Sequence, residues 1–310
     1  ARGMAELTNA IQKFFLEHSR LGIPVMFHEE CLHGHAAKDG TSFPQPIGLG
    51  ATFNPALVEK LYAMTAHETR VRGGHQALTP VVDVARDARW GRVEETYGED
   101  PYLTSRMAVS FVSAFEKSGI ITTPKHFIAN VGDGGRDSYP IHFNERLLDE
   151  IYFPPFKACI QEGGSRSVMT AYNSLDGVAC SSNSWLLQQK LKGGWGFKGF
   201  VISDANAVGG EVVLHHTAKN YEEACRHAIG NGLDVIFQTD VHHYKLFISP
   251  FLNGEIDSNR INDAVSRVLR AKFELGLFEK PYVSLAEAAK WTNNESHKYL
   301  ARLAAFESIV

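Results

Sequence analysis

Residues 78–84 read Leu-Thr-Pro-Val-Val-Asp-Val and continue into Ala-Arg-Asp-Ala-Arg-Trp-Gly-Arg at residues 85–92. The first part is a short apolar, β-branched run of the kind that forms a buried strand, and the second is a charged loop. The chain contains five more apolar runs that polar residues end or follow, at residues 23–27, 120–127, 167–172, 200–202 and 234–237. This repetition predicts that buried strands end in polar loops throughout the chain.

The segments between these runs have helical periodicity, at residues 55–71, 101–117, 144–162, 184–191, 221–229 and from residue 257 onward. Asn54 with Pro55, and Asp257 or Ser258, suit helix starts. Strand and helix in alternation predict parallel βαβ units, in an open doubly wound sheet or in a closed barrel. No strand is followed by a glycine-rich phosphate-binding loop, since the first one runs into His28-Glu29-Glu30. We therefore predict an α/β fold, a TIM-like (β/α)8 barrel that need not be regular.

The composition is that of an ordinary globular protein. The 310 residues are 44% hydrophobic and 21% charged, with Lys+Arg 31 against Asp+Glu 35, which excludes intrinsic disorder. A net charge of −4 argues against nucleic-acid and anionic-membrane partners, and no apolar run reaches the roughly 20 residues that span a bilayer. Four cysteines are too few for a disulfide framework. No signal peptide is expected at Ala1-Arg2-Gly3-Met4, and the location of the protein stays open.

Polar side chains follow the ends of the predicted strands, where a barrel carries its active site. They are Glu29, Glu30, Arg86, Asp87, Arg89, Arg92, Lys125, His126, Tyr172, Asn173, Asp204 and Asp240. Carboxylates, cations and a tyrosine with few apolar neighbours predict a polar ligand that is rich in hydroxyl groups. A sugar fits this description better than a nucleotide or a lipid.

Structural explanations compete for several of these residues. Asp204 could cap the next helix, and Arg86 with Asp87 fits best as part of an ion-pair network in a loop. Lys125 could extend its amine to solvent from a strand end, and His126 could be a buried core histidine. The histidines at positions 28, 33 and 35 do not have the HExxH spacing, so we predict neither a metal nor a cofactor.

From Leu21 to Val310 the chain resembles the barrel domain of family 3 glycoside hydrolases, the retaining β-glucosidases and β-xylosidases. The most specific segment is the Arg-Trp-Gly-Arg of residues 89–92, followed by Gly-Glu-Asp-Pro at 98–101. The other matching segments occur in the family's order, at residues 21–24, 29–34, 43–49, 125–127, 168–173, 195–197 and 199–204.

The resemblance implies that Asp204 is the catalytic nucleophile and that Tyr172 lies beside it. It also implies that Glu30, Arg92, Lys125 and His126 bind hydroxyls of the sugar; the family often has Asp where Glu30 stands. The implied activity is that of a retaining exo-acting β-glycosidase, in the first place a β-glucosidase that releases terminal non-reducing β-D-glucosyl residues through a glycosyl-Asp intermediate. A β-xylosidase is the alternative, and the substrate would be a β-linked oligosaccharide or an aryl or alkyl β-glycoside.

The chain departs from the family's pattern at two places. Ala205 follows the expected nucleophile where the family usually has a tryptophan that stacks on the sugar. The general acid/base has no matching residue either: one branch supplies it from an Asp-Ser-His loop, and this chain reads Asp137-Ser138-Tyr139. Two-domain members take a glutamate from a second α/β domain. We therefore expect a catalytic barrel over residues 1–280 and a connector helix over 281–310, leading to a second domain outside these 310 residues, on the same polypeptide or a separate chain.

Two hypotheses from other classes remain at this point. One is a lyase that forms a Schiff base at Lys125, and the other is a barrel that binds glycans without cleaving them. The sequence leaves the oligomeric state open, including a homo-oligomer.

Overall fold

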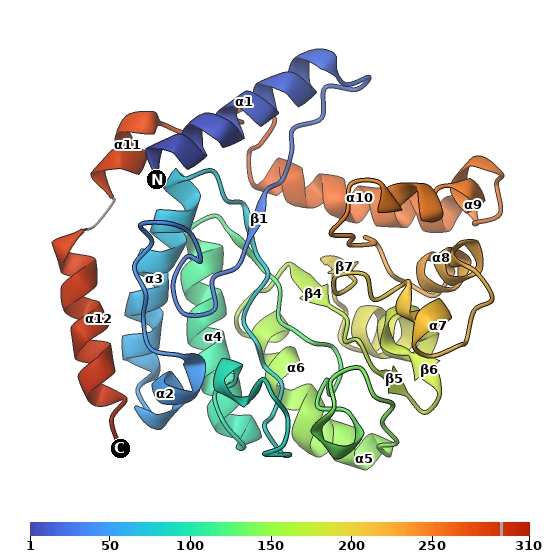
Figure 1. The fold of residues 1–310 in the computed structure, drawn as a ribbon, viewed down its shortest axis with the longest axis horizontal. Coiled ribbons are helices and arrows are strands. Elements are labelled where there is room, and N and C mark those ends of the chain that lie inside the picture. The colour runs from blue at the N-terminus through green and yellow to red at the C-terminus, as the bar shows by residue number, and fades with distance from the viewer. Residues whose placement is uncertain (292–293) are drawn as a thin grey trace.

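The computed structural model describes residues 1–291 and 294–310. Its α-helices are α1 (Arg2–His18), α2 (Pro46–Ala51), α3 (Pro55–Val71), α4 (Pro101–Lys117), α5 (Glu145–Leu147), α6 (Phe153–Gln161), α7 (Gly210–Val213), α8 (Tyr221–Gly230), α9 (Ser249–Leu252), α10 (Ser258–Glu274), α11 (Leu285–Lys290) and α12 (Glu295–Glu307). Its strands are β1 (His28–Glu29), β2 (Gln76–Ala77), β3 (Ile121–Thr122), β4 (Ser167–Met169), β5 (Ser174–Leu175), β6 (Val178–Ala179) and β7 (Phe200–Ile202). Helices and strands alternate along most of the chain (Figure 1).

The parallel strands follow one another in sequence order. β1 pairs with β2 and β2 with β3, and β4 pairs with β7. Single bridges extend this order, joining Phe127 to Thr170 and Ile202 to Val235. The structure thus confirms the α/β class and the parallel βαβ construction.

Closure of the barrel is not observed. Within residues 1–291 and 294–310, no strand pairing joins the segment 234–237 back to β1. The rings of His28 and Phe237 touch edge to face at 5.0 Å, and a largely apolar groove of about 1020 Å³ separates the two segments elsewhere. The parallel order of strands expected for a TIM-like barrel is therefore confirmed. The closure of the barrel between segment 234–237 and β1 is not.

The strands are shorter than the apolar runs that predict them, for physical reasons. In the run 78–84, Pro80 has no N–H to donate, and pairing resumes only at Val81, which bridges to Lys125. In the run 23–27, the side chain of Gln12 takes both main-chain groups of Val25, with N···O distances of 2.7 Å. These main-chain groups are therefore not available to a β-ladder.

The two helix starts predicted from capping residues are confirmed, at α3 and α10. Asn54 accepts a hydrogen bond from the Leu57 N–H at the start of α3, and Asp100 does the same for Leu103 in α4. Asp257 caps α10. The helix predicted over 144–162 instead contains a π-helical segment, η3 (Leu148–Tyr152), between α5 and α6. Pro154 and Pro155 follow it and cannot donate the i→i−4 hydrogen bonds of a regular helix.

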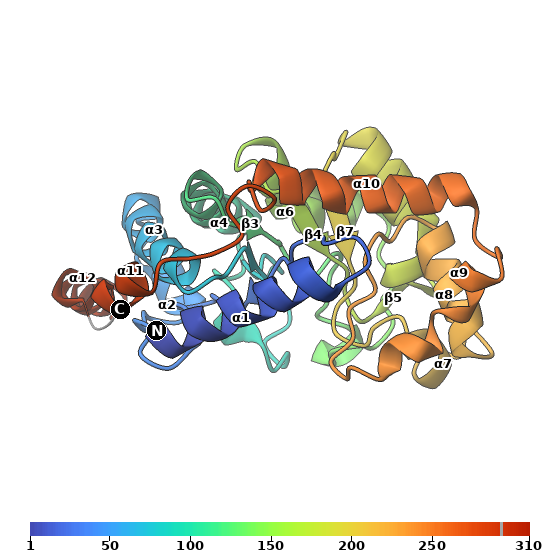
Figure 2. The same ribbon diagram turned by 90° about the horizontal axis from the view of Figure 1, so that it is seen from above.

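The segment predicted as a helix over 184–191 is also π-helical, as η5 (Trp185–Gly194). Helix α1 was not predicted, and it lies with α10 at one end of the molecule (Figures 1 and 2). In the described part of the chain, no helix combines the length and the apolar character that crossing a membrane requires.

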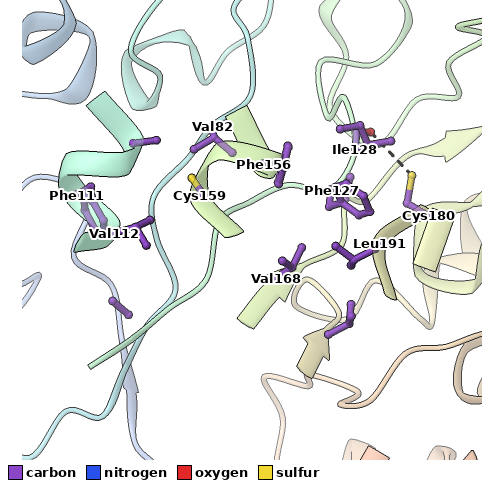
Figure 3. Packing of buried hydrophobic residues seen from close by; sticks show 14 of the residues in the cluster. Val82, Phe111, Val112, Phe127, Ile128, Phe156, Cys159, Val168, Cys180 and Leu191 are labelled. Atoms are coloured by element: carbon purple, nitrogen blue, oxygen red, sulfur yellow. Dashed lines mark hydrogen bonds between the residues drawn. The ribbon is translucent and has the colours of Figure 1, made fainter. Parts of the chain in front are cut away.

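The apolar core has two layers, because successive side chains of a strand point to opposite faces. Val168 and Val201 face the helices and pack in a large cluster with residues of α3, α4 and α6, part of which is shown in Figure 3. Their neighbours Met169, Phe200 and Ile202 belong to a smaller cluster on the other face. The strands are thus buried on both faces, as parallel strands in α/β proteins are.

In the C-terminal region, the described residues 281–291 and 294–310 include the helices α11 and α12. Both pack on α3, and α12 lies outermost beside it (Figure 1). The inner face of α12 buries His297, Leu300 and Ala304, whereas Tyr299 and Phe306 are about 70% exposed or more.

Candidate active site

Three of the predicted site residues lie within three residues of the carboxyl end of a strand. Glu30 follows β1, Tyr172 lies three residues beyond β4, and Asp204 lies two residues beyond β7. Because β1, β4 and β7 belong to one succession of parallel strands, their carboxyl ends lie on the same side of it. Lys125 joins the group from the segment after β3, through its bridge to Val81.

Lys125 and Glu30 form an ion pair. The Lys125 Nζ donates to Glu30 Oε1 at 2.8 Å, and the lysine side chain is 7% exposed while that of the glutamate is 48% exposed. A buried ammonium is thus held by a carboxylate that still reaches solvent. Both groups retain hydrogen-bonding capacity, which a hydroxyl-rich ligand could use.

His126 lies between two carboxylates. Its Nδ1 is 2.8 Å from Asp83 Oδ2, and its Nε2 is 3.5 Å from Asp204 Oδ2. Burial lowers the pKa of His126 well below its ordinary value, and the charge of Arg92 acts in the same direction. Burial also raises the pKa of Asp83 to about 6, against the hydrogen bonds it accepts from the main chain of His126 and Asn130.

Asp204 is nearly buried. Its Oδ1 accepts a hydrogen bond from the Ala205 N–H at 2.7 Å, whereas its Oδ2 is buried and has no hydrogen-bond partner. Asp204 does not cap the next helix, since α7 begins six residues later after Gly209. The capping explanation is therefore wrong for this residue.

Arg92 is fixed by carboxylates from its own loop and the next one. Its Nε and Nη2 donate to the two oxygens of Glu95 at 2.7 and 2.8 Å, and its Nη1 lies 3.6 Å from Asp137 Oδ2. Burial works against the charge, but Glu95 and Asp137 raise the pKa of Arg92 above its ordinary value. Trp90 Nε1 and Asn130 Nδ2 also donate to Asp137, at 3.2 and 2.6 Å.

Tyr172 is half-buried beside Asp204. Its N–H donates to Asn130 Oδ1 at 3.3 Å, and its carbonyl accepts a hydrogen bond from His215 Nε2 at 2.8 Å. Burial raises the pKa of the Tyr172 phenol, and the nearby charge of Asp204 adds to this effect. The structure therefore brings together the six residues proposed for the site, namely Glu30, Arg92, Lys125, His126, Tyr172 and Asp204.

Other polar residues that follow the ends of the predicted strands lie apart from this cluster. Asp87 pairs with Arg89 at 2.7 Å on the exposed loop, so the ion-pair hypothesis holds for Asp87, with Arg89 as its partner. Asn173 points into the interior, where its Nδ2 donates to the Ile128 carbonyl. The exposed Asp240 accepts a hydrogen bond from the His242 N–H in a turn.

Sequence reasoning missed Asp83 and Asn130. Asp83 is 1% exposed and accepts three hydrogen bonds, two from His126 and one from the Asn130 N–H. The signal was present, because an aspartate inside the run Val-Val-Asp-Val is buried only if it is fully hydrogen-bonded. Among the described residues, no group of three or more His, Cys, Asp or Glu side chains could hold a metal ion.

The geometry can be compared with known proteins. The family model described as the glycosyl hydrolase family 3 N terminal domain matches residues 2–271. The chain belongs to glycosyl hydrolase family 3. A family 3 relative named beta-xylosidase, from Formosa agariphila, is 35% identical over 94% of this chain and 43% of its own length. The periplasmic beta-glucosidase of Salmonella typhimurium is 36% identical over 94% of this chain and 39% of its own length.

Solved structures superimpose on all or nearly all of this chain. A β-glucosidase from Erythrobacter marinus gives a TM-score of 0.95 at 34% identity, covering 100% of this chain and 42% of that one. The β-glucosidase of Listeria innocua in complex with glucose gives 0.89 at 33% identity, covering 96% and 42%. The 310 residues thus span about two fifths of the length of the family 3 proteins they match.

Proposed function

We propose that this protein is a retaining, exo-acting β-glycosidase that acts through a covalent glycosyl-Asp204 intermediate. One observation carries the proposal: Asp204 Oδ2 is buried without a hydrogen-bond partner at the centre of the polar cluster, 3.5 Å from His126 Nε2. A buried acceptor with no partner is costly unless a ligand or a reaction uses it. A carboxylate oxygen that no protein group occupies is available to attack an anomeric carbon.

The surrounding residues suit the binding of a sugar in this position. Lys125 and Arg92 offer charged donors, and Glu30 offers a half-exposed acceptor for equatorial hydroxyls. Hydrogen bonds of this kind accelerate the reaction to the extent that they strengthen at the oxocarbenium-like transition state. The same contacts make a Schiff-base reaction at Lys125 less favourable, because its amine is committed to Glu30.

The general acid/base is expected from outside the described cluster. Asp137, in the loop where another branch of the family carries its acid/base dyad, is occupied by Trp90, Asn130 and Arg92. We therefore propose that residues 1–280 form the barrel domain, and that residues 281–310 lead to a second α/β domain that supplies this group. The greater length of the relatives and the exposed apolar side chains Tyr299 and Phe306 on α12 support this arrangement.

We propose a β-glucosidase as the first choice of substrate class, with a β-xylosidase as the alternative. Relatives with both names match the chain at nearly equal identity, and the solved structures with high TM-scores include several β-glucosidases. A hexose and a pentose differ by one hydroxymethyl group. Rates with matched aryl β-glucosides and β-xylosides will decide between them.

The nucleophile is tested with the full-length protein and a 2-fluoro β-glucoside that traps the glycosyl-enzyme. We expect peptide mass spectrometry to find the label on Asp204, and Asp204→Asn to lower kcat by more than about a thousandfold. Asp240→Asn is the matched control, since Asp240 follows the apolar segment 234–237 but is exposed and accepts a hydrogen bond from the His242 N–H. A label on another residue, or full activity of Asp204→Asn, contradicts the assignment. Sugar binding without any cleavage would favour a glycan-binding barrel.

A further inference from the structure

The buried Asp83 carboxylate makes its three hydrogen bonds to two residues, His126 and Asn130. Its Oδ2 accepts from the main-chain N–H of His126 at 3.0 Å and lies 2.8 Å from the His126 Nδ1, and its Oδ1 accepts from the Asn130 N–H at 3.2 Å. The side chain of Asp83 is 0% exposed and that of His126 is 1% exposed. One carboxylate therefore fixes both the backbone and the ring of the histidine.

This contact determines where the imidazole carries its proton. An ionised carboxylate only accepts hydrogen bonds, so the nitrogen that faces Asp83 must be the protonated one. In a neutral ring the other nitrogen, Nε2, is then a bare acceptor. The Nε2 is the atom that points toward Asp204, at 3.5 Å from Oδ2.

The charged groups around His126 favour the neutral ring. Burial is the main cause, and the two cations Arg92 and Lys125 add to it, while the carboxylates of Asp204 and Glu95 oppose it. Asp83 stands on the far side of the ring. With Nε2 bare and Asp204 Oδ2 without a partner, two acceptors face each other and neither can satisfy the other. A ligand that brings a hydroxyl donor between them relieves both.

We propose that Asp83 is a positioning residue that holds His126 in the neutral Nδ1–H tautomer, so that Nε2 accepts a hydrogen bond from a hydroxyl of the sugar bound beside Asp204. This inference rests on the proposed glycosidase function for the identity of the ligand. The tautomer itself follows from the contacts of Asp83 alone. The site thereby selects for a sugar that presents a hydroxyl donor at this place.

The variant Asp83→Asn tests the proposal, because an amide cannot accept all three hydrogen bonds and turns an N–H toward another N–H. The full-length protein is labelled with 15N-histidine, and the ring shifts of His126 are measured with and without glucose. We expect a protonated Nδ1 and a bare Nε2 in the unaltered protein, and a mixture or reversal of tautomers in Asp83→Asn. The matched control is Glu68→Gln, which removes another buried carboxylate that faces a histidine, His297, at a different site.

Kinetics provide a second readout. With 4-nitrophenyl β-D-glucopyranoside, Asp83→Asn should lose about 10- to 100-fold in kcat/KM, the range for one hydrogen bond to a charged group. Among the 3-, 4- and 6-deoxy glucosides, one analogue should have a much lower kcat/KM than the parent glucoside in the unaltered protein. In Asp83→Asn the difference between this analogue and the parent glucoside should be much smaller. The effects of removing the sugar hydroxyl and of substituting Asp83 should therefore not add, because in Asp83→Asn the His126 Nε2 no longer accepts a hydrogen bond reliably.

The proposal is overturned if His126 carries its proton on Nε2 in the unaltered protein, a measurement that needs no variant and no activity. It is equally overturned if Asp83→Asn keeps the tautomer and loses activity only as Glu68→Gln does. Absence of any glycosidase activity, with no label on Asp204, would instead refute the proposed function. The NMR measurement of the His126 tautomer does not depend on activity and would still test the role of Asp83.

Discussion

Glu68 in α3 and His297 in α12 form a buried pair across 229 residues of sequence, with Glu68 Oε1 2.5 Å from His297 Nδ1. Their side chains are 1% and 3% exposed. Thr41 completes the site by donating both its N–H and its hydroxyl to the Glu68 carboxylate. This cluster anchors the outermost helix to the body of the molecule.

Removing the Glu68 charge should destabilise the protein. The Glu68 carboxylate accepts three hydrogen bonds, from His297 and Thr41, and the amide of Glu68→Gln cannot accept all three. A buried donor left without its acceptor costs about 1–3 kcal/mol. Glu59→Gln on the same helix is the control, because Glu59 pairs with the exposed Lys117 and such pairs contribute about 1 kcal/mol or less. Urea unfolding of the two variants measures the difference, and equal losses would contradict the anchoring role.

The same pair predicts a loss of stability in acid. Burial opposes ionisation of Glu68, but the hydrogen bonds from His297 and Thr41 outweigh it and leave the pKa of Glu68 below its ordinary value of 4.5. A carboxyl group whose pKa is lowered by folding stabilises the protein above that ordinary value and loses the contribution as pH falls through the folded-state pKa. The urea concentration at the midpoint of unfolding should therefore decrease when the pH is lowered below about 4.5. This decrease should be smaller in Glu68→Gln.

Activity should fall at a higher pH than stability does. The pKa of Asp83 is raised by burial to about 6, so that Asp83 takes up a proton as pH falls through 6 and ceases to be a pure acceptor for His126. We expect an acid limb of kcat/KM near pH 6 that is absent in Asp83→Asn. Because a raised carboxyl pKa favours folding at low pH, Asp83 itself adds stability in this window. Circular dichroism should show a folded protein at pH 5.5, and unfolding there would contradict this explanation.

Lys125→Met should separate binding from folding. The substitution removes a charged donor, which we expect to lower kcat/KM for an aryl β-glucoside by about 100-fold. Glu30, left without its partner, is half exposed and can be solvated, so the free energy of unfolding should change by about 1 kcal/mol or less. Lys117→Met, on the exposed surface of α4, serves as the control and should leave the kinetics unchanged. Unaltered kinetics in Lys125→Met would remove this residue from the site.

The aromatic packing between α3 and α4 should dominate the stability of the helical layer. Phe111 is 1% exposed, stacks on Phe115 at a centroid distance of 4.5 Å and contacts the tilted ring of Tyr62 at 4.2 Å. Phe111→Ala should cost about 3–5 kcal/mol in the free energy of unfolding. The control is Tyr102→Ala on the same helix, where the side chain is 73% exposed and the change should be about 0.5 kcal/mol or less. Similar losses in the two variants would contradict the assignment of the core.

The sequence alone predicted the features that depend on local chemistry. The capping residues Asn54 and Asp257 mark helix starts, because a short polar side chain can satisfy the free main-chain N–H groups of the first turn. Polar residues at or after the ends of apolar runs, such as Lys125 and Asp204, were predicted to lie on one side of the fold, because parallel strands have their carboxyl ends on the same side. The six proposed site residues could be named in this way.

Only the tertiary structure decided which groups meet across the chain. In the sequence, Asp83 is an aspartate inside an apolar run, and only the fold brings His126 and Asn130 into contact with it. Glu68 likewise contacts His297 because α12 packs on α3. The open edge between β1 and the segment 234–237 likewise depends on pairing between distant strands. Local propensity follows from neighbours in sequence, whereas hydrogen bonds between buried groups depend on distances that the whole fold sets.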